Sequence, residues 1–255
     1  MNLVKMNLFR QNLKEMYSKN MDQDQSAMSI GELIDSALSE TNKEFGETDD
    51  ICTMKNMNNK EKFCHLLRST GREGVEIIIS ELEDSGFFEA PASANHHLNC
   101  TGGLLQHSLN VCETALAMRS YFEEKNQMYA HGIPRDSVII ASLLHDVCKC
   151  DIYKEALVNK RSADGKWEKV PGYVVDCEDL PVGHGEKSVI MLLLWGLKMT
   201  RDEILAIRWH MHAWDLAFQS YEQKMNIEKA RETTPLCILV QCADGMSAGI
   251  IEAKY

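Results

Sequence analysis

A histidine and an aspartate stand side by side in the middle of the chain, His145-Asp146, and Lys149 follows three residues later. Residues 138–144 before them are almost all apolar and would form a helix hydrophobic on every side, which normally lies within a core. A buried carboxylate needs a partner, because burying it unpaired costs several kcal/mol. A divalent cation would meet that need, since imidazole and carboxylate are ordinary ligands of Fe, Mn, Zn and Ni. The alternative is a histidine that caps the helix and an aspartate that lies in solvent.

Other polar residues recur at the ends of segments that otherwise read as core helices. His107 follows Gly-Gly-Leu-Leu-Gln, His184 opens an apolar segment, and His210 and His212 close another. Asp244 interrupts the last apolar segment. One explanation covers all of them: the helix ends converge on a metal site, as helical bundles commonly arrange.

The apolar periodicity of the chain predicts the helices that would position these residues. They cover residues 61–69, 73–85, 104–125, 134–146, 183–197, 200–212 and 235–248. Thr200 and Glu203 form a capping box that opens one of them. After the central helix the pattern breaks, and Ala156–Val158, the turn Asp164-Gly165 and Trp167–Val175 predict a β-hairpin. The predicted fold is all-α, a helical bundle with a small inserted β-hairpin.

Residues 1–58 carry weaker signals. Helices are expected at residues 1–17 and 29–45, and the segments between are polar and rich in Met, Asn and Asp. We therefore divide the chain into a helical or partly mobile N-terminal extension, residues 1–58, and a domain that contains all the candidate ligands, residues 59–255.

The composition is that of a soluble globular protein, with 44% hydrophobic and 25% charged residues among 255. No apolar run approaches the roughly 20 residues of a membrane span, and residues 1–20 lack the apolar core of a signal peptide. The nine cysteines are scattered without paired zinc spacing, and reduced thiols fit the cytoplasm. We expect a cytoplasmic protein with no membrane contact. Its net charge of −11 gives no global basic footprint for duplex nucleic acid.

The order of the candidate residues resembles that in the HD-domain metal-dependent phosphohydrolases. That order is His107, His145-Asp146, His184, His210 and Asp244. Four stretches within residues 87–251 are still more similar to the HD domain of the 3′–5′ exoribonucleases of Gram-positive bacteria. These are Phe87–His97, Gly102–Leu109, Ala141–Lys149 and Gly183–Gly185. The resemblance implies that residues 59–255 form an HD-type metal-dependent phosphohydrolase domain.

Two features depart from that pattern. Cys148 stands where the family usually has a glycine between the aspartate and the lysine. The exoribonucleases also carry an OB-type β-barrel before the HD domain, whereas residues 1–86 read as helical and too poor in strands for one. We therefore expect a nucleotide or another phosphorylated small molecule as the substrate, and nucleic acid is not favoured.

The resemblance, together with the ligand chemistry, implies two divalent transition metal ions. The ligands of the first would be His107, His145, Asp146 and Asp244, and those of the second Asp146, His184 and His210. Imidazole ligands favour Mn or Fe over Mg, and Ni, Co and Zn are also compatible. A metal-activated hydroxide would attack phosphorus. Asp146 would bridge the two ions, and Lys149 would neutralise a phosphate oxygen.

Three more histidines are candidates for substrate contact: His96, His97 and His212. His96 and His97 fall in an irregular segment, and the resemblance brings them toward the site. His212 lies about 200° around a regular helix from His210, so both cannot face one metal. Which of these two binds metal stays open from the sequence.

Three other functions share this pattern of residues. One is a 3′–5′ exonuclease on single-stranded nucleic acid, another is a non-catalytic metal-binding regulatory module, and the third is an HD oxygenase with a di-iron site. The complete ligand set argues against loss of turnover, and Lys149 favours phosphate chemistry over oxygenation. We therefore favour a metal-dependent phosphohydrolase, either a phosphomonoesterase or a phosphodiesterase, acting on a nucleotide or other phosphate ester.

Overall fold

The computed structural model describes residue 11 and residues 57–125, 133–162, 164–176, 180–211 and 221–253. The chain divides into two compact units, Met1–Met57 and Asn58–Tyr255, and nearly all described residues belong to the second. The helices predicted at residues 1–17 and 29–45 lie outside the described residues, apart from Gln11, which is helical. The assignment of functions to residues 1–58 and 59–255 stays a prediction.

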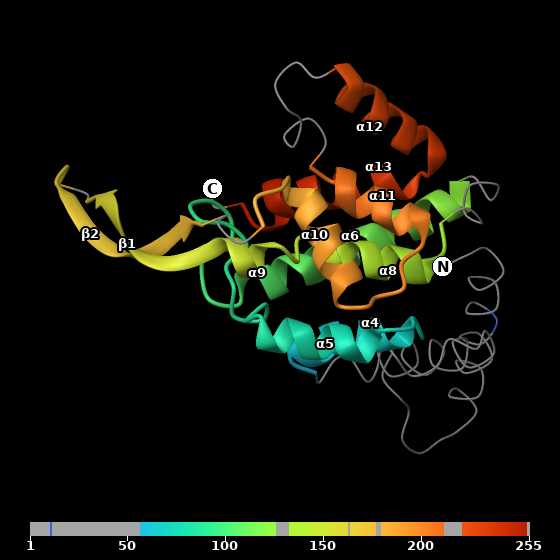
Figure 1. The fold of residues 1–255 in the computed structure, drawn as a ribbon, viewed down its shortest axis with the longest axis horizontal. Helices are drawn as coiled ribbons and strands as arrows, with labels where there is room; N and C mark the ends of the chain where they lie inside the picture. Colours follow the sequence, from blue (N-terminus) through green and yellow to red (C-terminus); the bar gives the residue numbers. More distant parts are fainter. Residues whose placement is uncertain are drawn as a thin grey trace, which may run out of the picture. The chain divides into compact units, whose positions relative to one another are not determined.

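The second unit is helical apart from one hairpin, which confirms the predicted fold class (Figure 1). Its helices are α4 (Asn59–Ser69), α5 (Val75–Asp84), α6 (Gly103–Lys125), α8 (Arg135–Leu144), α9 (Lys149–Ile152), α10 (His184–Leu194), α11 (Arg201–Trp209), α12 (Tyr221–Thr233) and α13 (Leu236–Met246). A short π-helix, η2 (Ser247–Ile251), continues α13. The strands β1 (Tyr153–Arg161) and β2 (Trp167–Val175) form the hairpin.

Helix α8 lies at the centre of the unit. Every residue from Ser137 to Leu144 is buried, as the apolar pattern on all sides predicts. The helix packs against α6, α11 and α13 and also touches α4 (Figure 1). α8 ends at Leu144, and the His145-Asp146 pair that follows it directly is also buried in the core.

Two glycines let backbone segments approach closely beside candidate ligands. A Cβ on Gly185 in α10 would collide with the backbone carbonyl of Arg208 in α11. A Cβ on Gly103, at the start of α6, would collide with the carbonyl oxygen of Leu98. A side chain at either position would therefore push apart the elements that carry the histidines.

The hairpin is antiparallel, with Tyr153 opposite Val175 at its base and Arg161 opposite Trp167 at its tip. The turn contains the predicted Asp164-Gly165 pair, and Gly165 has a φ of +84°, a conformation that suits glycine. The first strand begins at Tyr153, three residues before the predicted Ala156. The two strands extend away from the helices (Figure 1).

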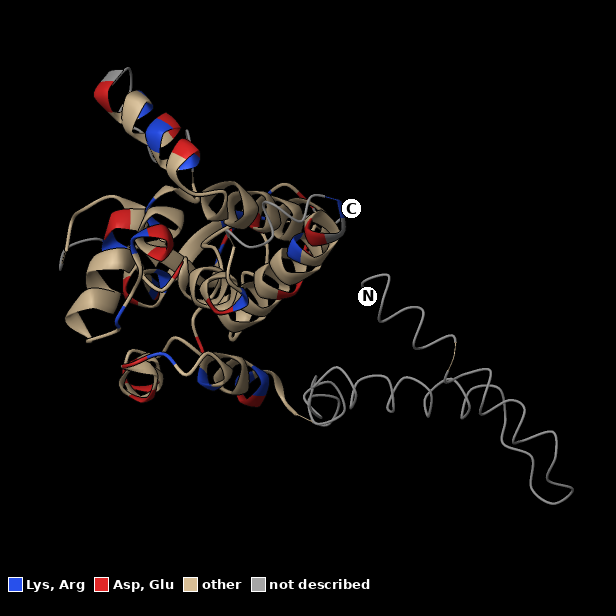
Figure 2. Ribbon diagram, turned by 90° about the vertical axis from the view of Figure 1, so that its right-hand side faces the viewer, with Lys and Arg blue, Asp and Glu red and all other residues tan. Residues whose placement is uncertain are grey.

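Helix α12 has no counterpart among the helices predicted from the sequence. It alternates acidic and basic residues along its length, as Figure 2 shows, and of its apolar residues only Ile227 and Ala230 are buried. Such a helix lacks the apolar stripe on which the prediction depended.

Among the described helices, none is by itself long and apolar enough to cross a membrane. Two successive helices, Glu222–Thr233 and Leu236–Ile251, have the length and composition of a membrane span only when they are taken together, and a bend of 105° separates them.

A buried carboxylate, Glu203, ties α11 to the α4–α5 connection and to α8. Glu203 is fully buried, and Arg72 donates to both of its carboxylate oxygens at 2.8 and 2.7 Å. The hydroxyl of Ser137 in α8 donates to the same carboxylate at 2.7 Å. The backbone N–H of Thr200 also donates to it at 2.8 Å, which completes the predicted capping box of α11.

Replacing Arg72 with alanine should lower the free energy of unfolding by about 3 kcal/mol, because it leaves the buried Glu203 carboxylate without its counter-ion. Urea denaturation of the purified chain measures this. Arg68→Ala is the matched control, since Arg68 pairs with Glu76 at the surface, where ion pairs contribute little. Equal effects of the two substitutions would contradict a structural role for the buried pair.

Candidate metal centre

Asp146 lies at the centre of the site and is almost completely buried. Its Oδ1 atom is 2.5 Å from His184 Nε2 and 3.3 Å from His210 Nε2. Its Oδ2 atom is 3.2 Å from His145 Nε2 and 3.5 Å from His107 Nε2. The two oxygens of one carboxylate therefore face two different pairs of imidazoles.

Asp244, in α13, lies beside the two imidazoles that face the Oδ2 atom of Asp146. Its Oδ1 atom is 3.3 Å from His107 Nε2 and 4.0 Å from His145 Nε2. Among the described residues, four overlapping groups have donor atoms within 4.8 Å of one another, which is close enough to share a metal ion. Three of them surround Asp146: His107, His145 and Asp146; His145, His210 and Asp244; and Asp146, His184 and His210. The fourth, His97, His107 and Glu252, lies on the other side of the His107 ring.

Three of the imidazoles are held so that their Nε2 atoms face the centre. His145 Nδ1–H donates to the Ser142 carbonyl at 2.8 Å, and His210 Nδ1–H donates to the Ile207 carbonyl at 2.7 Å. His107 Nδ1–H donates to a carboxylate instead. In the described part of the chain, the Nε2 atoms of all three are buried without a hydrogen-bond partner. An imidazole held at Nδ1 with a bare Nε2 is the arrangement of a metal ligand, so these residues fit a cation.

The electrostatics of the site also favour positive charge. Burial would lower the pKa of His107, but three neighbouring carboxylates raise it to about 10. Burial would likewise lower the pKa of His184, which a neighbouring thiol and Asp146 raise to about 9. Burial alone would raise the pKa of Asp146, yet Lys149 and the histidines hold it well below its usual range. A group of buried carboxylates that stabilises cations this strongly suits a divalent ion.

The structure brings together all six residues predicted as ligands: His107, His145, Asp146, His184, His210 and Asp244. It also brings Lys149 to them, with Nζ 2.6 Å from Asp146 Oδ2. His210 lies in the cluster, whereas His212 lies outside the described residues.

The segment between α5 and α6 brings His97 to the site and leaves His96 exposed. The His97 ring lies 5.0 Å from the His107 ring, centroid to centroid. The Ser93 hydroxyl braces the segment by donating to the His97 carbonyl and accepting from the His96 N–H, both at 2.8 Å. Leu98 adopts a φ of +44°, which is uncommon for a residue other than glycine and turns the chain back toward α6.

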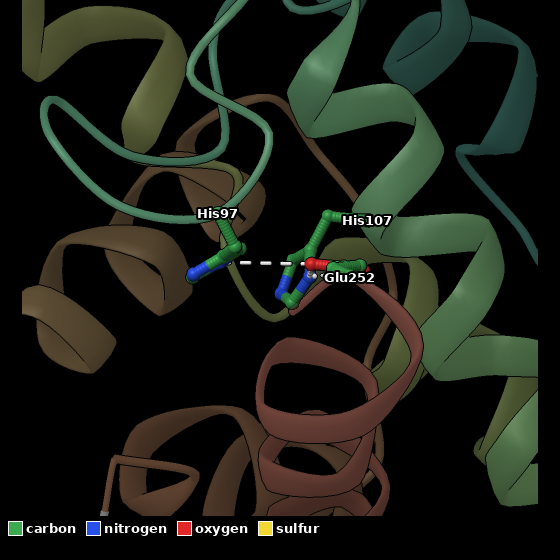
Figure 3. A group of neighbouring side chains, drawn as sticks. All are labelled: His97, His107 and Glu252. Atoms are coloured by element: carbon green, nitrogen blue, oxygen red, sulfur yellow. Dashed lines mark hydrogen bonds and ion pairs between the residues drawn. The ribbon is translucent and has the colours of Figure 1, made fainter. Parts of the chain in front are cut away.

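Two residues beside the histidines were not predicted to contact them. Glu252 accepts from His107 Nδ1–H, with both carboxylate oxygens at 3.0 Å (Figure 3). The Cys148 sulfur lies 3.4 Å from His184 Nδ1 and 3.8 Å from His184 Nε2. The thiol therefore lies against the His184 ring, close to both of its nitrogens. Cys148 stands out in the sequence only as a departure from the family pattern, and Glu252 has no periodic signal at all.

Helix ends deliver four imidazoles and two carboxylates to one buried point of a helical bundle, where they could hold a metal ion. Residues 104–249 match the HD domain, and the chain belongs to the HD-domain family. That match confirms the resemblance to HD-domain proteins. The more specific likeness to the Gram-positive exoribonucleases is not confirmed.

Over 61 residues the chain is 43% identical to a dihydroneopterin 2′,3′-cyclic phosphate phosphodiesterase of Methanocaldococcus jannaschii. The similar segment is 24% of this chain and 23% of that relative, so the two are alike over less than a quarter of either. No solved structure matches the chain significantly.

Replacing Asp146 with asparagine should remove bound metal from both halves of the site, because the carboxylate faces both pairs of imidazoles. His184→Ala should weaken binding in one half only. Elemental analysis after reconstitution with Mn²⁺ or Fe²⁺ measures both effects. Asp164→Asn, in the exposed hairpin turn, serves as the control and should bind as the unmodified chain does. Full metal content in the Asp146→Asn chain would contradict this reading of the site.

Proposed function

We propose that this chain is a metal-dependent phosphohydrolase and that residues 59–255 carry its activity. The observation that supports this best is the convergence of four imidazoles on the two oxygens of one buried carboxylate, Asp146. Membership of the HD-domain family supports the same activity.

The donor set fits two divalent transition metal ions. One would be held by His107, His145, Asp146 and Asp244, and the other by Asp146, His184 and His210. Manganese or iron suits these mixed imidazole and carboxylate ligands, and nickel, cobalt and zinc are also compatible with them. When bound, such ions polarise phosphoryl oxygens and lower the pKa of a coordinated water.

Lys149 is the residue we assign to charge stabilisation during the reaction. Its side chain is only 10% exposed, and its ammonium touches the central carboxylate at 2.6 Å. Burial would lower its pKa, but Asp146 raises it, so the group stays protonated. A fixed ammonium at this point can neutralise a non-bridging phosphoryl oxygen, whose charge grows as the ester bond breaks.

His97 is the residue we assign to substrate contact. It lies beside His107 and its side chain is 21% exposed. In the described part of the chain, its Nε2 atom makes no hydrogen bond, and a longer ion-pair contact of 3.8 Å joins it to Glu252 Oε2. A phosphate or hydroxyl group of a substrate could pair with that nitrogen. His96 is exposed, and His212 lies outside the described residues, so their parts in substrate binding stay predictions.

We favour a small phosphodiester as the substrate, with a phosphomonoester as the weaker alternative. The similar segment of the Methanocaldococcus protein supports this, since that protein is named for the hydrolysis of a cyclic phosphodiester. The net charge of −11 weighs against long nucleic acid, whose phosphates the surface would repel.

The chain reconstituted with Mn²⁺ or Fe²⁺ should hydrolyse bis(p-nitrophenyl) phosphate and nucleoside 2′,3′-cyclic phosphates, and p-nitrophenyl phosphate more slowly. Release of p-nitrophenol and chromatography of the nucleotide products measure this. Faster hydrolysis of the monoester would overturn the diester preference. No turnover of any of these esters by metal-loaded protein would overturn the proposed function.

Two lysine variants separate the chemical step from metal binding. Lys149→Met, which keeps the length but loses the charge, should retain metal and lower kcat by about 100-fold, the usual scale for one lost electrostatic group. Lys166→Met, in the exposed hairpin turn, is the control and should leave kcat unchanged. Undiminished kcat in Lys149→Met would remove Lys149 from the mechanism.

A further inference from the structure

We infer that Glu252 is a positioning residue of the metal centre, which fixes the tautomer and the ring orientation of His107. It lies outside residues 104–249, the span that matches the HD domain. The inference rests on the proposed metal site and adds to it a residue that acts through a ligand rather than on the metal.

The contacts of Glu252 point to this role. Its side chain is 1% exposed, and both of its carboxylate oxygens lie 3.0 Å from His107 Nδ1. The side-chain amide of Asn110, one turn further along α6, donates to Oε1 at 2.9 Å and holds the carboxylate in place. Figure 3 shows the carboxylate against the His107 ring and its ion pair with His97, whose Nε2 atom lies 3.8 Å from Oε2. A carboxylate on one ring nitrogen makes the other a more basic ligand and fixes its direction.

The π-helix explains how Asp244 and Glu252 can both reach one imidazole. Asp244 faces Nε2 of His107 at 3.3 Å, and Glu252 faces Nδ1. In a continuous α-helix, residues this far apart would be separated by about 12 Å along the axis and roughly 80° around it. Instead α13 ends at Met246, and the Glu252 N–H donates at 2.9 Å to the Ser247 carbonyl, five residues back. The wider turn brings the carboxylate to the far side of the ring, and π turns often occur at functional sites.

The geometry distinguishes this role from that of a third carboxylate ligand. Both oxygens of Glu252 lie at hydrogen-bonding distance from a nitrogen that must carry a proton to donate to them. Nδ1 is engaged by Glu252, whereas Nε2 faces the Asp146 and Asp244 carboxylates, on the side where the other candidate ligands converge. Loss of Glu252 should therefore change how tightly metal binds and leave the number of ions unchanged.

The test compares Mn²⁺ binding by Glu252→Ala, Glu252→Gln and the unmodified full chain, using calorimetric titration and elemental analysis. Glu252→Ala should weaken binding in the half that contains His107 by about 10- to 100-fold, the usual effect of losing such a partner. Glu252→Gln should lose less, since its amide oxygen still accepts from Nδ1–H. Binding in the half that contains His184 and His210 should be unchanged.

Glu113→Ala is the control, because Glu113 is exposed on α6, the helix that carries His107, and has no part in the site. It should bind Mn²⁺ as the unmodified chain does. Unchanged affinity in Glu252→Ala, or the loss of one ion, would overturn the inference. So would an equal loss in both halves with a lower melting temperature of the metal-free chain, which is the mark of a merely structural residue. If the unmodified chain binds no metal, the proposed function fails as well.

Discussion

The site depends on one buried carboxylate that must be neutralised from two sides. Asp146 is removed from water, and the free energy of burying its charge is offset only by the groups that surround it. Four imidazoles and the Lys149 ammonium lie within 3.5 Å of its two oxygens. Because each oxygen faces its own pair of histidines, the neutralisation of Asp146 also creates two adjoining groups of donor atoms that could each hold a metal ion.

The helices serve to bring those groups together from distant parts of the chain. α8 carries His145 and Asp146 into the centre, and the others approach it from α6, α10, α11 and α13. Glu203 joins α11 to the α4–α5 connection through Arg72 and to α8 through Ser137, and Gly185 allows α10 to meet α11 backbone to backbone. The scaffold therefore contributes to function by holding imidazoles at fixed separations, such as 5.4 Å between the rings of His184 and His210.

The residues that could be predicted from the sequence are those whose burial would be costly without a partner. Asp244 is such a case, because it stands in an apolar segment whose periodicity correctly predicts helix α13. Glu252 could not be found in this way, since only a π turn brings it to His107. The choice between His96 and His97 depends on the irregular segment between α5 and α6, including the positive φ of Leu98, which no periodicity records. Helix α12 was missed because its stability comes from helix-forming charged residues rather than from an apolar stripe.

The central claim is that Asp146 bridges two metal ions, and anomalous diffraction from crystals grown with Mn²⁺ tests it most directly. The account predicts two peaks about 3.5–4 Å apart, the spacing of two-metal sites. Each peak should lie within bonding distance of one oxygen of Asp146. One should also contact His107 and His145, and the other His184 and His210. A single peak that contacts only one oxygen of Asp146, or peaks away from these histidines, would contradict the account.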